Sequence, residues 1–218
     1  MNKYKLILEL KESYYAKKSE IEKRILEFKK VSLLGSEDEI FYELAFCLLT
    51  PQSKAKVCWK AIEKIAKNEI TLNRENKEDI SKSLCGVRFK NNKADYILNA
   101  KELFLNNGKI KIKERINSFA SASEAREWLV KNVKGMGYKE ASHFLRNIGF
   151  ADDLAILDRH ILKNLKIFGI IEEIPKSLSK KKYLEIEEKM RNLANEVNIP
   201  LSHLDLLFWS KETGEIFK

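Results

Sequence analysis

The sequence predicts an all-α fold. Glycine and proline, which interrupt helices, are scarce: the 218 residues include 8 glycines and 3 prolines, below the usual shares of about 7% and 5%. Apolar residues recur at spacings of three and four through most of the chain, the pattern of helices with one buried face, and the alternation that predicts strands is scarce. A chain of this length can bury one large core or two small ones.

Glycine, serine and proline residues mark the predicted helix boundaries in the first part of the chain. An amphipathic helix is expected over about 7–30, and Gly35 and Ser36 form the loop after it. The apolar stretch 38–49 predicts a helix that Pro51 ends, because proline cannot continue a helix. Periodic apolar residues predict further helices at 53–67, 76–84, 92–106, 113–119 and 123–132.

Composition narrows the functional classes without deciding among them. A net charge of +9 suits a polyanionic partner, because cations that meet phosphates release counterions, although an ordinary solvated surface explains it as well. Cys47, Cys58 and Cys85 form neither a disulfide set nor a metal-binding pattern, and the three histidines are scattered. With no signal peptide or long apolar run visible, we expect a cytoplasmic protein in a reducing compartment, without membrane contact.

The window 131–160 combines a tight hairpin with a lysine at a helix start. Gly135 and Gly137 flank one apolar residue, a spacing that favours positive φ at both glycines and leaves backbone amides free to bind phosphate. The following apolar spacing predicts a helix that ends at Gly149, with Lys139 in its first turn. A cation there opposes the helix dipole by roughly 0.3–1 kcal/mol, so stability does not explain its position.

Lys139 is therefore a candidate nucleophile. The dipole that disfavours an ammonium favours a neutral amine, which can form a Schiff base with a sugar aldehyde. The alternative is a solvated surface lysine, one of 41 basic residues. The Gly-x-Gly-x-Lys context favours the nucleophile.

Asp158, nineteen residues after Lys139, precedes another apolar-periodic stretch. The simple interpretation is an N-cap, because aspartate accepts hydrogen bonds from the free amides at a helix start. Capping also holds a carboxylate ionised and in one orientation, which suits a group that stabilises positive charge on a sugar ring. Asp158 is accordingly a candidate for both roles.

These motifs resemble a known enzyme signature. Lys-Gly-Met-Gly-Tyr-Lys-Glu-Ala-Ser-His (134–143) and Leu-Asp-Arg-His (157–160) are similar to the hairpin, lysine and aspartate of the helix-hairpin-helix DNA glycosylases. They are most similar to the compact second class of 8-oxoguanine DNA glycosylases, from archaea and some bacteria. The resemblance extends from about Phe41 to the carboxyl end.

The resemblance implies a bifunctional DNA repair enzyme, a DNA N-glycosylase and abasic-site lyase. In that family the lysine, here Lys139, attacks C1′ of a flipped nucleotide, the base leaves, and the imine permits β-elimination; Asp158 is its electrostatic partner. Double-stranded DNA containing oxidised guanine is the expected substrate, and the chain is expected to be a monomer. Two alternatives stay open: a glycosylase for oxidised pyrimidines, and a non-catalytic hairpin module that only binds DNA.

The resemblance also implies the domain organisation and the cofactors. It predicts two helical lobes with a DNA-binding cleft between them: 1–52 joined with 134–218, and 53–133. The chain lacks the four closely spaced cysteines of an iron–sulfur cluster, so no such cofactor is expected. A structural Na⁺ or K⁺ is expected at the hairpin, on the backbone carbonyls of Lys131, Val133 and Met136.

The loop 86–90 contains candidates for DNA distortion. An enzyme that extrudes a base must fill the vacated stack and satisfy the orphaned partner. Phe89 is the candidate wedge, Arg88 the candidate donor to the estranged base, and Gln52 a further DNA contact. Alternatively, Phe89 packs its helix onto the core, Arg88 is a solvated cation and Gln52 is a cap.

The last eighteen residues contain candidates for base recognition. Asp205 and Trp209 are four apart and share one face of a leucine-rich helix, where an indole can stack on a purine and a carboxylate can accept its hydrogens. The alternative is a core tryptophan with a paired or capping aspartate. The resemblance adds the terminal carboxylate of Lys218, and Met136 is a candidate for the opposite wall of the base pocket, although core packing explains it equally.

Overall fold

A computed structural model of the protein describes residues 3–67 and 77–218, and about 71% of the chain is helical. The all-α prediction is confirmed. The helices are α1 (Lys3–Leu34), α2 (Glu37–Leu49), α3 (Ala55–Lys67), α4 (Lys77–Ser83), α5 (Lys90–Phe104), α6 (Ile112–Asn117), α7 (Ala122–Asn132), α8 (Tyr138–Asn147), α9 (Arg159–Ile167), α10 (Lys180–Val197) and α11 (Leu201–Thr213).

The predicted helices lie within a few residues of their expected bounds, with three differences. The predicted helix 92–106 ends at Phe104, because β1 (Leu105–Asn106) pairs with the antiparallel β2 (Lys109–Ile110). The predicted helix 76–84 begins at a residue outside the described ranges. Helix α10 has no counterpart among the predicted helices.

Serine caps fix several helix starts. The Ser36 hydroxyl accepts from the Glu39 amide at 3.2 Å, and the Glu39 carboxylate accepts from the Ser36 amide at 2.8 Å, which is a capping box. Ser121 caps α7 and Ser179 caps α10 in the same way, through their hydroxyls. The chain thus specifies its helix starts locally, before any tertiary contact forms.

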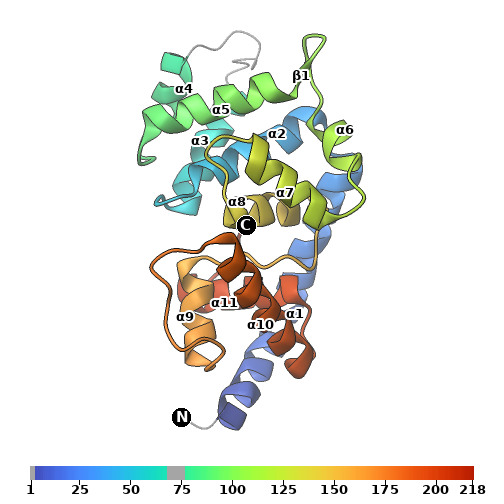
Figure 1. Cartoon of the computed structure of the whole chain (residues 1–218), viewed down its shortest axis with the longest axis vertical. Coiled ribbons are helices and arrows are strands. Elements are labelled where there is room, and N and C mark those ends of the chain that lie inside the picture. Colours follow the sequence, from blue (N-terminus) through green and yellow to red (C-terminus); the bar gives the residue numbers. More distant parts are fainter. Residues whose placement is uncertain (1–2, 68–76) are drawn as a thin grey trace.

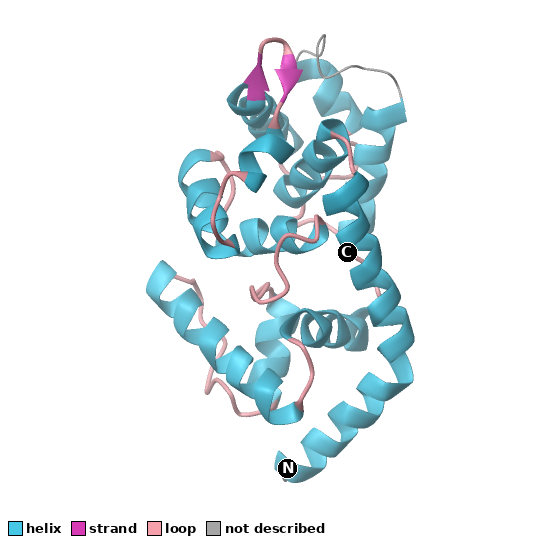
Figure 2. Ribbon diagram, turned by 90° about the vertical axis from the view of Figure 1, so that its right-hand side faces the viewer, coloured by secondary structure: helices cyan, strands magenta, loops and turns pink. Residues whose placement is uncertain are grey.

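Two hydrophobic cores organise the helices. The first gathers buried residues between Ile40 and Leu154, from α2 through α8. The second joins α1 to α9, α10 and α11. Figure 1 shows these groups at opposite ends of the molecule, with α8 and the carboxyl terminus between them and α1 running alongside. Figure 2 shows the strand pair at the end opposite the amino terminus.

The predicted lobes, 1–52 with 134–218 and 53–133, stay a prediction. The first core draws residues from both sides of each predicted boundary, since Phe41, Ala61 and Phe144 all belong to it. Among the described helices, none is long and apolar enough to cross a membrane.

Candidate active site

The hairpin between α7 and α8 is built around one positive-φ glycine. Gly135 has φ +85°, and a Cβ there would come within 2.4 Å of the Tyr96 ring, so only glycine fits. Gly137 has φ −100° and ψ −176°, and the prediction of positive φ at this second glycine is wrong. Gly137 is instead the extended N-cap residue of α8, and its amide donates to the Glu140 carboxylate at 3.2 Å.

Lys139 lies in the first turn of α8, as predicted, and its side chain is 22% exposed. Its Nζ donates to the Thr50 hydroxyl at 3.1 Å and lies 3.7 Å from the Glu140 carboxylate. A solvated surface lysine does not fit this placement. The amine is partly buried and oriented by another element, as a nucleophile requires.

Thr50 is a site residue that the sequence analysis missed. It is the C-cap of α2, and its hydroxyl donates to the Cys47 carbonyl at 2.9 Å. Because that bond uses the hydroxyl hydrogen, the oxygen lone pairs are left to accept from Lys139. In the sequence, Thr50 is a threonine at a predicted helix end before Pro51. This local pattern does not indicate a contact with a lysine 89 residues away.

Asp158 is the N-cap of α9, as predicted. One carboxylate oxygen, Oδ1, accepts from the amides of His160 and Ile161, each at 2.8 Å. Two hydrogen bonds to one oxygen hold the carboxylate in one orientation and leave the other oxygen unused by the cap.

The segment that leads to Asp158 is fixed by α10. The Tyr183 hydroxyl donates to the Ala155 carbonyl at 2.6 Å and accepts from the Leu157 amide at 3.3 Å. The Glu187 carboxylate accepts from the Ala155 amide at 2.8 Å. Glu187 also forms a buried two-point pair with Arg126 of α7, at 2.6 and 2.9 Å. This pair joins α7 to α10 and, through the Ala155 amide, to the segment that leads to Asp158.

A buried carboxyl group connects the two candidate catalytic residues. Asp205 of α11 is 5% exposed and pairs with Arg146 of α8 at 3.6 Å. Burial raises the pKa of Asp205 to about 7; Arg146 and Lys139 oppose the rise and Asp158 adds to it. Lys139 and Asp158 both influence the pKa of Asp205, so both lie in the neighbourhood of this buried carboxyl group.

The carboxyl-terminal tail ends close to α8 (Figure 1). The rings of Trp209 and Phe217 stack with centroids 6.2 Å apart and planes 30° apart. The Lys218 ammonium pairs with Glu43 and lies 3.3 Å from the centre of the Trp59 ring, which anchors the last residue. Figure 1 shows the terminus between α8 and the helices that follow it.

Buried His143 lies one helical turn after Lys139 on α8. Burial, with the nearby charges of Lys139 and Arg146, holds the pKa of His143 well below its ordinary value. The imidazole is therefore neutral at physiological pH and adds no charge beside the amine.

Comparison with known proteins identifies the family. A family model described as 8-oxoguanine DNA glycosylase matches residues 21–199, most of the chain. This chain belongs to the 8-oxoguanine DNA glycosylase family. A protein of Fusobacterium nucleatum named 8-oxoguanine DNA glycosylase/AP lyase is 47% identical over 218 residues, which cover 100% of both chains. A Methanocaldococcus jannaschii protein of the same name is 47% identical and covers 98% of both chains.

Solved structures of the family have the same fold. The 8-oxoguanine DNA glycosylase of Thermotoga maritima is 36% identical, covers 100% of both chains and superposes with a TM-score of 0.87. The Methanocaldococcus jannaschii 8-oxoguanine glycosylase/lyase, in complex with a 15mer DNA containing 8-oxoguanine, is 42% identical and has a TM-score of 0.88. That alignment covers 98% of this chain and 99% of the other.

In this glycosylase the predicted DNA-distorting loop is exposed and strained. Phe89 has φ +57° and is 55% exposed, so the alternative in which it packs onto the core is wrong. The Arg88 guanidinium lies over the Phe89 ring at 5.4 Å, and the Arg88 amide donates to the Ser53 hydroxyl at 3.1 Å. Gln52 also has a positive φ, +54°. Strained non-glycine residues of this kind concentrate at functional sites, although contact with DNA stays a prediction.

Two other predicted features of the glycosylase stay predictions. Met136 is 5% exposed and packs in the first core, and its role as a wall of the base pocket stays a prediction.

The Val133 carbonyl, part of the predicted cation site, accepts from the Met136 amide at 3.2 Å and keeps its second lone pair. Such backbone oxygens fit a monovalent cation, whereas no cluster of three metal-binding side chains occurs within the described ranges.

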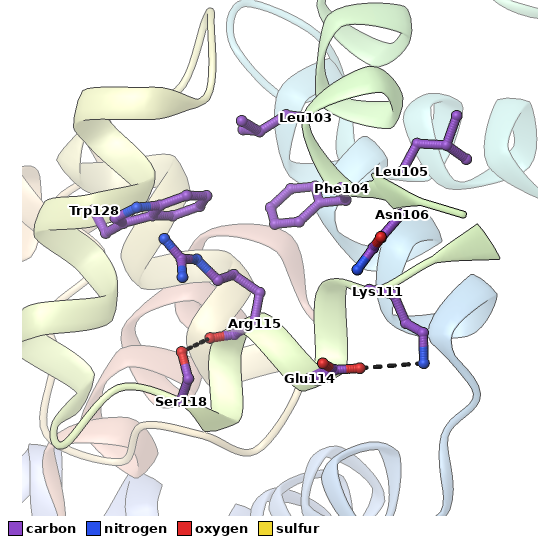
Figure 3. Close-up of a pocket in the computed structure, with 9 residues that line it drawn as sticks. All are labelled: Leu103, Phe104, Leu105, Asn106, Lys111, Glu114, Arg115, Ser118 and Trp128. Atoms are coloured by element: carbon purple, nitrogen blue, oxygen red, sulfur yellow. Dashed lines mark hydrogen bonds and ion pairs between the residues drawn. The ribbon is translucent and has the colours of Figure 1, made fainter. Parts of the chain in front are cut away.

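A cavity of about 430 Å³ lies elsewhere in the glycosylase, between α5, α6 and α7 (Figure 3). The Arg115 guanidinium stacks over the Trp128 ring at 4.6 Å along its wall. Lys139, Asp158 and the other predicted site residues do not line it. The cavity is therefore separate from the candidate active site.

Proposed function

We propose that this chain excises 8-oxoguanine from double-stranded DNA and then cleaves the strand at the abasic site, with Lys139 as the nucleophile. The observation that carries the proposal is the placement of the Lys139 amine. It is partly buried, it is held by Thr50, and both it and the capped Asp158 lie near the buried Asp205. Membership of the 8-oxoguanine DNA glycosylase family supports the same reaction.

The chemistry follows from these two groups. The neutral Lys139 amine attacks C1′ as the bond from C1′ to the base breaks, and the base leaves with the bonding electrons and takes up a proton. Asp158 stabilises the positive charge that develops on the sugar. A proton passes from the attached nitrogen to the ring oxygen O4′ as the C1′–O4′ bond breaks, which opens the sugar ring and gives a protonated imine. The imine acidifies the C2′ hydrogen, and its removal expels the 3′ phosphate by β-elimination. Hydrolysis then frees Lys139.

We assign base recognition to the tail. In this proposal the flipped base stacks on Trp209 with Met136 opposite, and Asp205 and the Lys218 carboxylate accept its hydrogens. Phe217, which stacks on Trp209 in the free protein, yields its place to the base. The Lys218 side chain is already anchored by Glu43 and Trp59, so little order is lost when the terminal carboxylate binds.

The DNA itself is held by the hairpin and the exposed loop. The hairpin at Gly135 and Gly137 contacts a phosphate; the Met136 and Gly137 amides already donate to Val133 and Glu140, so these two amides must exchange partners to bind it. Phe89 fills the vacated stack, and Arg88 and Gln52 contact the neighbouring bases. A Na⁺ or K⁺ on the carbonyls of Lys131, Val133 and Met136 stabilises the hairpin turn when bound, and it takes no part in the chemistry.

Borohydride trapping tests the proposal. The protein is mixed with duplexes containing 8-oxoguanine, thymine glycol or unmodified guanine, and the imine is reduced to a stable adduct. We expect an adduct and strand cleavage on the 8-oxoguanine duplex and neither on the guanine duplex. Preferential reaction with thymine glycol would make the chain a pyrimidine glycosylase. Salt-sensitive binding without any adduct would make it a binding module.

A further inference from the structure

Lys93 is a buried cation that the reaction described above does not use. It lies in the first turn of α5 and is 3% exposed. Its Nζ donates to the carbonyls of Leu49 and Pro51, each at 2.7 Å, and to the Ser53 hydroxyl at 3.1 Å. An ammonium has three hydrogens, so all of its donors are used, and all three acceptors belong to one five-residue loop.

The loop 49–53 adjoins the candidate active site at Thr50. The Thr50 hydroxyl, which accepts from Lys139 at 3.1 Å, lies between two carbonyls that Lys93 holds. The Leu49 carbonyl accepts additionally from the Cys58 thiol at 3.2 Å. The orientation of Thr50, the hydrogen-bond partner of Lys139, therefore depends on loop 49–53. Lys93 fastens this loop to α5.

The same loop adjoins the DNA-distorting loop at Ser53. The Ser53 hydroxyl accepts from both Lys93 Nζ and the Arg88 amide, each at 3.1 Å. Gln52, with its positive φ, lies between Pro51 and Ser53, the two acceptors that restrain it. The buried Lys93 ammonium thus contacts both neighbours of Thr50, which holds the nucleophile, and Ser53, which holds the exposed loop.

We propose that Lys93 is a positioning residue, whose ammonium holds loop 49–53 in the conformation that places Thr50 against Lys139 and Ser53 against Arg88. This inference rests on the proposed role of Lys139. A buried charge is costly, and this one lies near Lys139 and Arg88, cations that together with burial lower the pKa of Lys93. A methionine of similar length would fill the same space without a buried charge, but it would leave the Leu49 and Pro51 carbonyls without this donor, so the lysine acts on the conformation of loop 49–53.

The test compares Lys93→Met with a matched packing variant, Ile97→Ala. Ile97 lies one turn further along α5 and is 1% exposed in the first core, but no hydrogen bond ties it to loop 49–53. Thermal melting and single-turnover excision at saturating 8-oxoguanine duplex are measured for both variants. We expect Lys93→Met to slow excision about 10- to 100-fold, because small displacements of catalytic groups have effects of this size. We expect Ile97→Ala to lower the melting temperature and to leave the rate within about twofold.

A double-mutant cycle separates positioning from general stability. Because Lys93 acts in part through Thr50, Lys93→Met should slow a Thr50→Val variant at least about threefold less than it slows the wild type. Independent effects that multiply in the double variant would overturn the proposal. So would a folded Lys93→Met protein with the wild-type rate.

Ser53→Ala provides a second variant in case Lys93→Met does not fold. It removes one acceptor of Lys93 and the link to the Arg88 amide without burying a new charge. We expect excision to slow about 3- to 10-fold, and an unchanged rate would contradict the inference. Absence of a wild-type adduct would refute the proposed function itself, whereas a normal wild type with unaffected variants would refute only the role of Lys93.

Discussion

The two candidate catalytic groups are held in different ways. Asp158 is fixed by its own helix, because its oxygen accepts from amides two and three residues further along the chain. Lys139 depends on Thr50, which is 89 residues away and whose loop is fastened in turn by Lys93. One group is oriented by local backbone geometry and the other by tertiary packing.

This difference has energetic consequences. A capping carboxylate has few rotatable bonds and gains hydrogen bonds where it sits, so it is ordered even when the surroundings shift. A lysine side chain has four rotatable bonds and loses up to about 2 kcal/mol of rotamer entropy when it is fixed. Perturbation of the packing around α2 and α5 should therefore affect the nucleophile before it affects Asp158.

The largest effect should come from Lys139→Gln. Glutamine can still bond to Thr50 but cannot form an imine, so we expect the single-turnover excision rate to fall about 10³-fold or more. Lys181→Gln, an exposed lysine on α10, is the charge-matched control and should react like the wild type. A Lys139→Gln protein that still gives a reducible adduct would refute the assignment.

Asp158→Asn should have the second-largest effect. It distinguishes the capping role of Asp158 from its electrostatic role. Asparagine caps a helix as well as aspartate does, so the melting temperature should hardly change, whereas excision should slow about 10²- to 10³-fold. Asp158→Ala should lose about 1 kcal/mol of stability in addition. If the asparagine variant kept the wild-type rate, Asp158 would be a cap and nothing more.

Asp205, on which both catalytic groups act, should give a pH-dependent effect. Its folded pKa of about 7 lies above the ordinary 3.8, so its contribution to stability is full below about pH 4 and is lost as the pH rises through 7. From pH 5 to pH 8, Asp205→Asn should gain about 2–3 kcal/mol of unfolding free energy relative to wild type. Denaturant unfolding at several pH values measures this difference, and a constant offset would show that the pKa is not raised.

Thr50→Val should have the smallest effect, and it tests the tertiary contact that orients Lys139. Valine keeps the shape of threonine but cannot accept from the amine, so excision should slow about 10-fold at saturating DNA. Thr50→Ser, which keeps the hydroxyl, is the control and should lie close to wild type. Equal rates in the two variants would remove Thr50 from the site.

The contrast between local and tertiary contacts also explains which features could be predicted from the sequence. The Asp158 cap, the Gly135 turn and the bounds of most helices depend on neighbours within a few residues, and these predictions hold. Gly137 was mispredicted because an extended N-cap and a positive-φ turn both accept glycine.

Long-range partners could not be read from the sequence. Thr50, Lys93 and the Arg126 pair with Glu187 come from segments far apart in the chain, and each residue alone is an ordinary polar residue on a helix. No local pattern distinguishes a lysine that points into loop 49–53 from one that points into solvent. The nucleophile was therefore predictable, whereas most of what orients it was not.

The most direct test is to identify the lysine that carries the sugar after borohydride reduction. The adduct with an 8-oxoguanine duplex is digested with nuclease and protease, and the modified peptide is sequenced by mass spectrometry. The charges of Lys93 and Lys139 both lower the pKa of the buried Cys58 thiol, so both amines lie near this residue. Identifying the modified lysine therefore distinguishes between two neighbouring amines. We expect a deoxyribose remnant on Lys139 alone. A remnant on Lys93 or on any other lysine would contradict it.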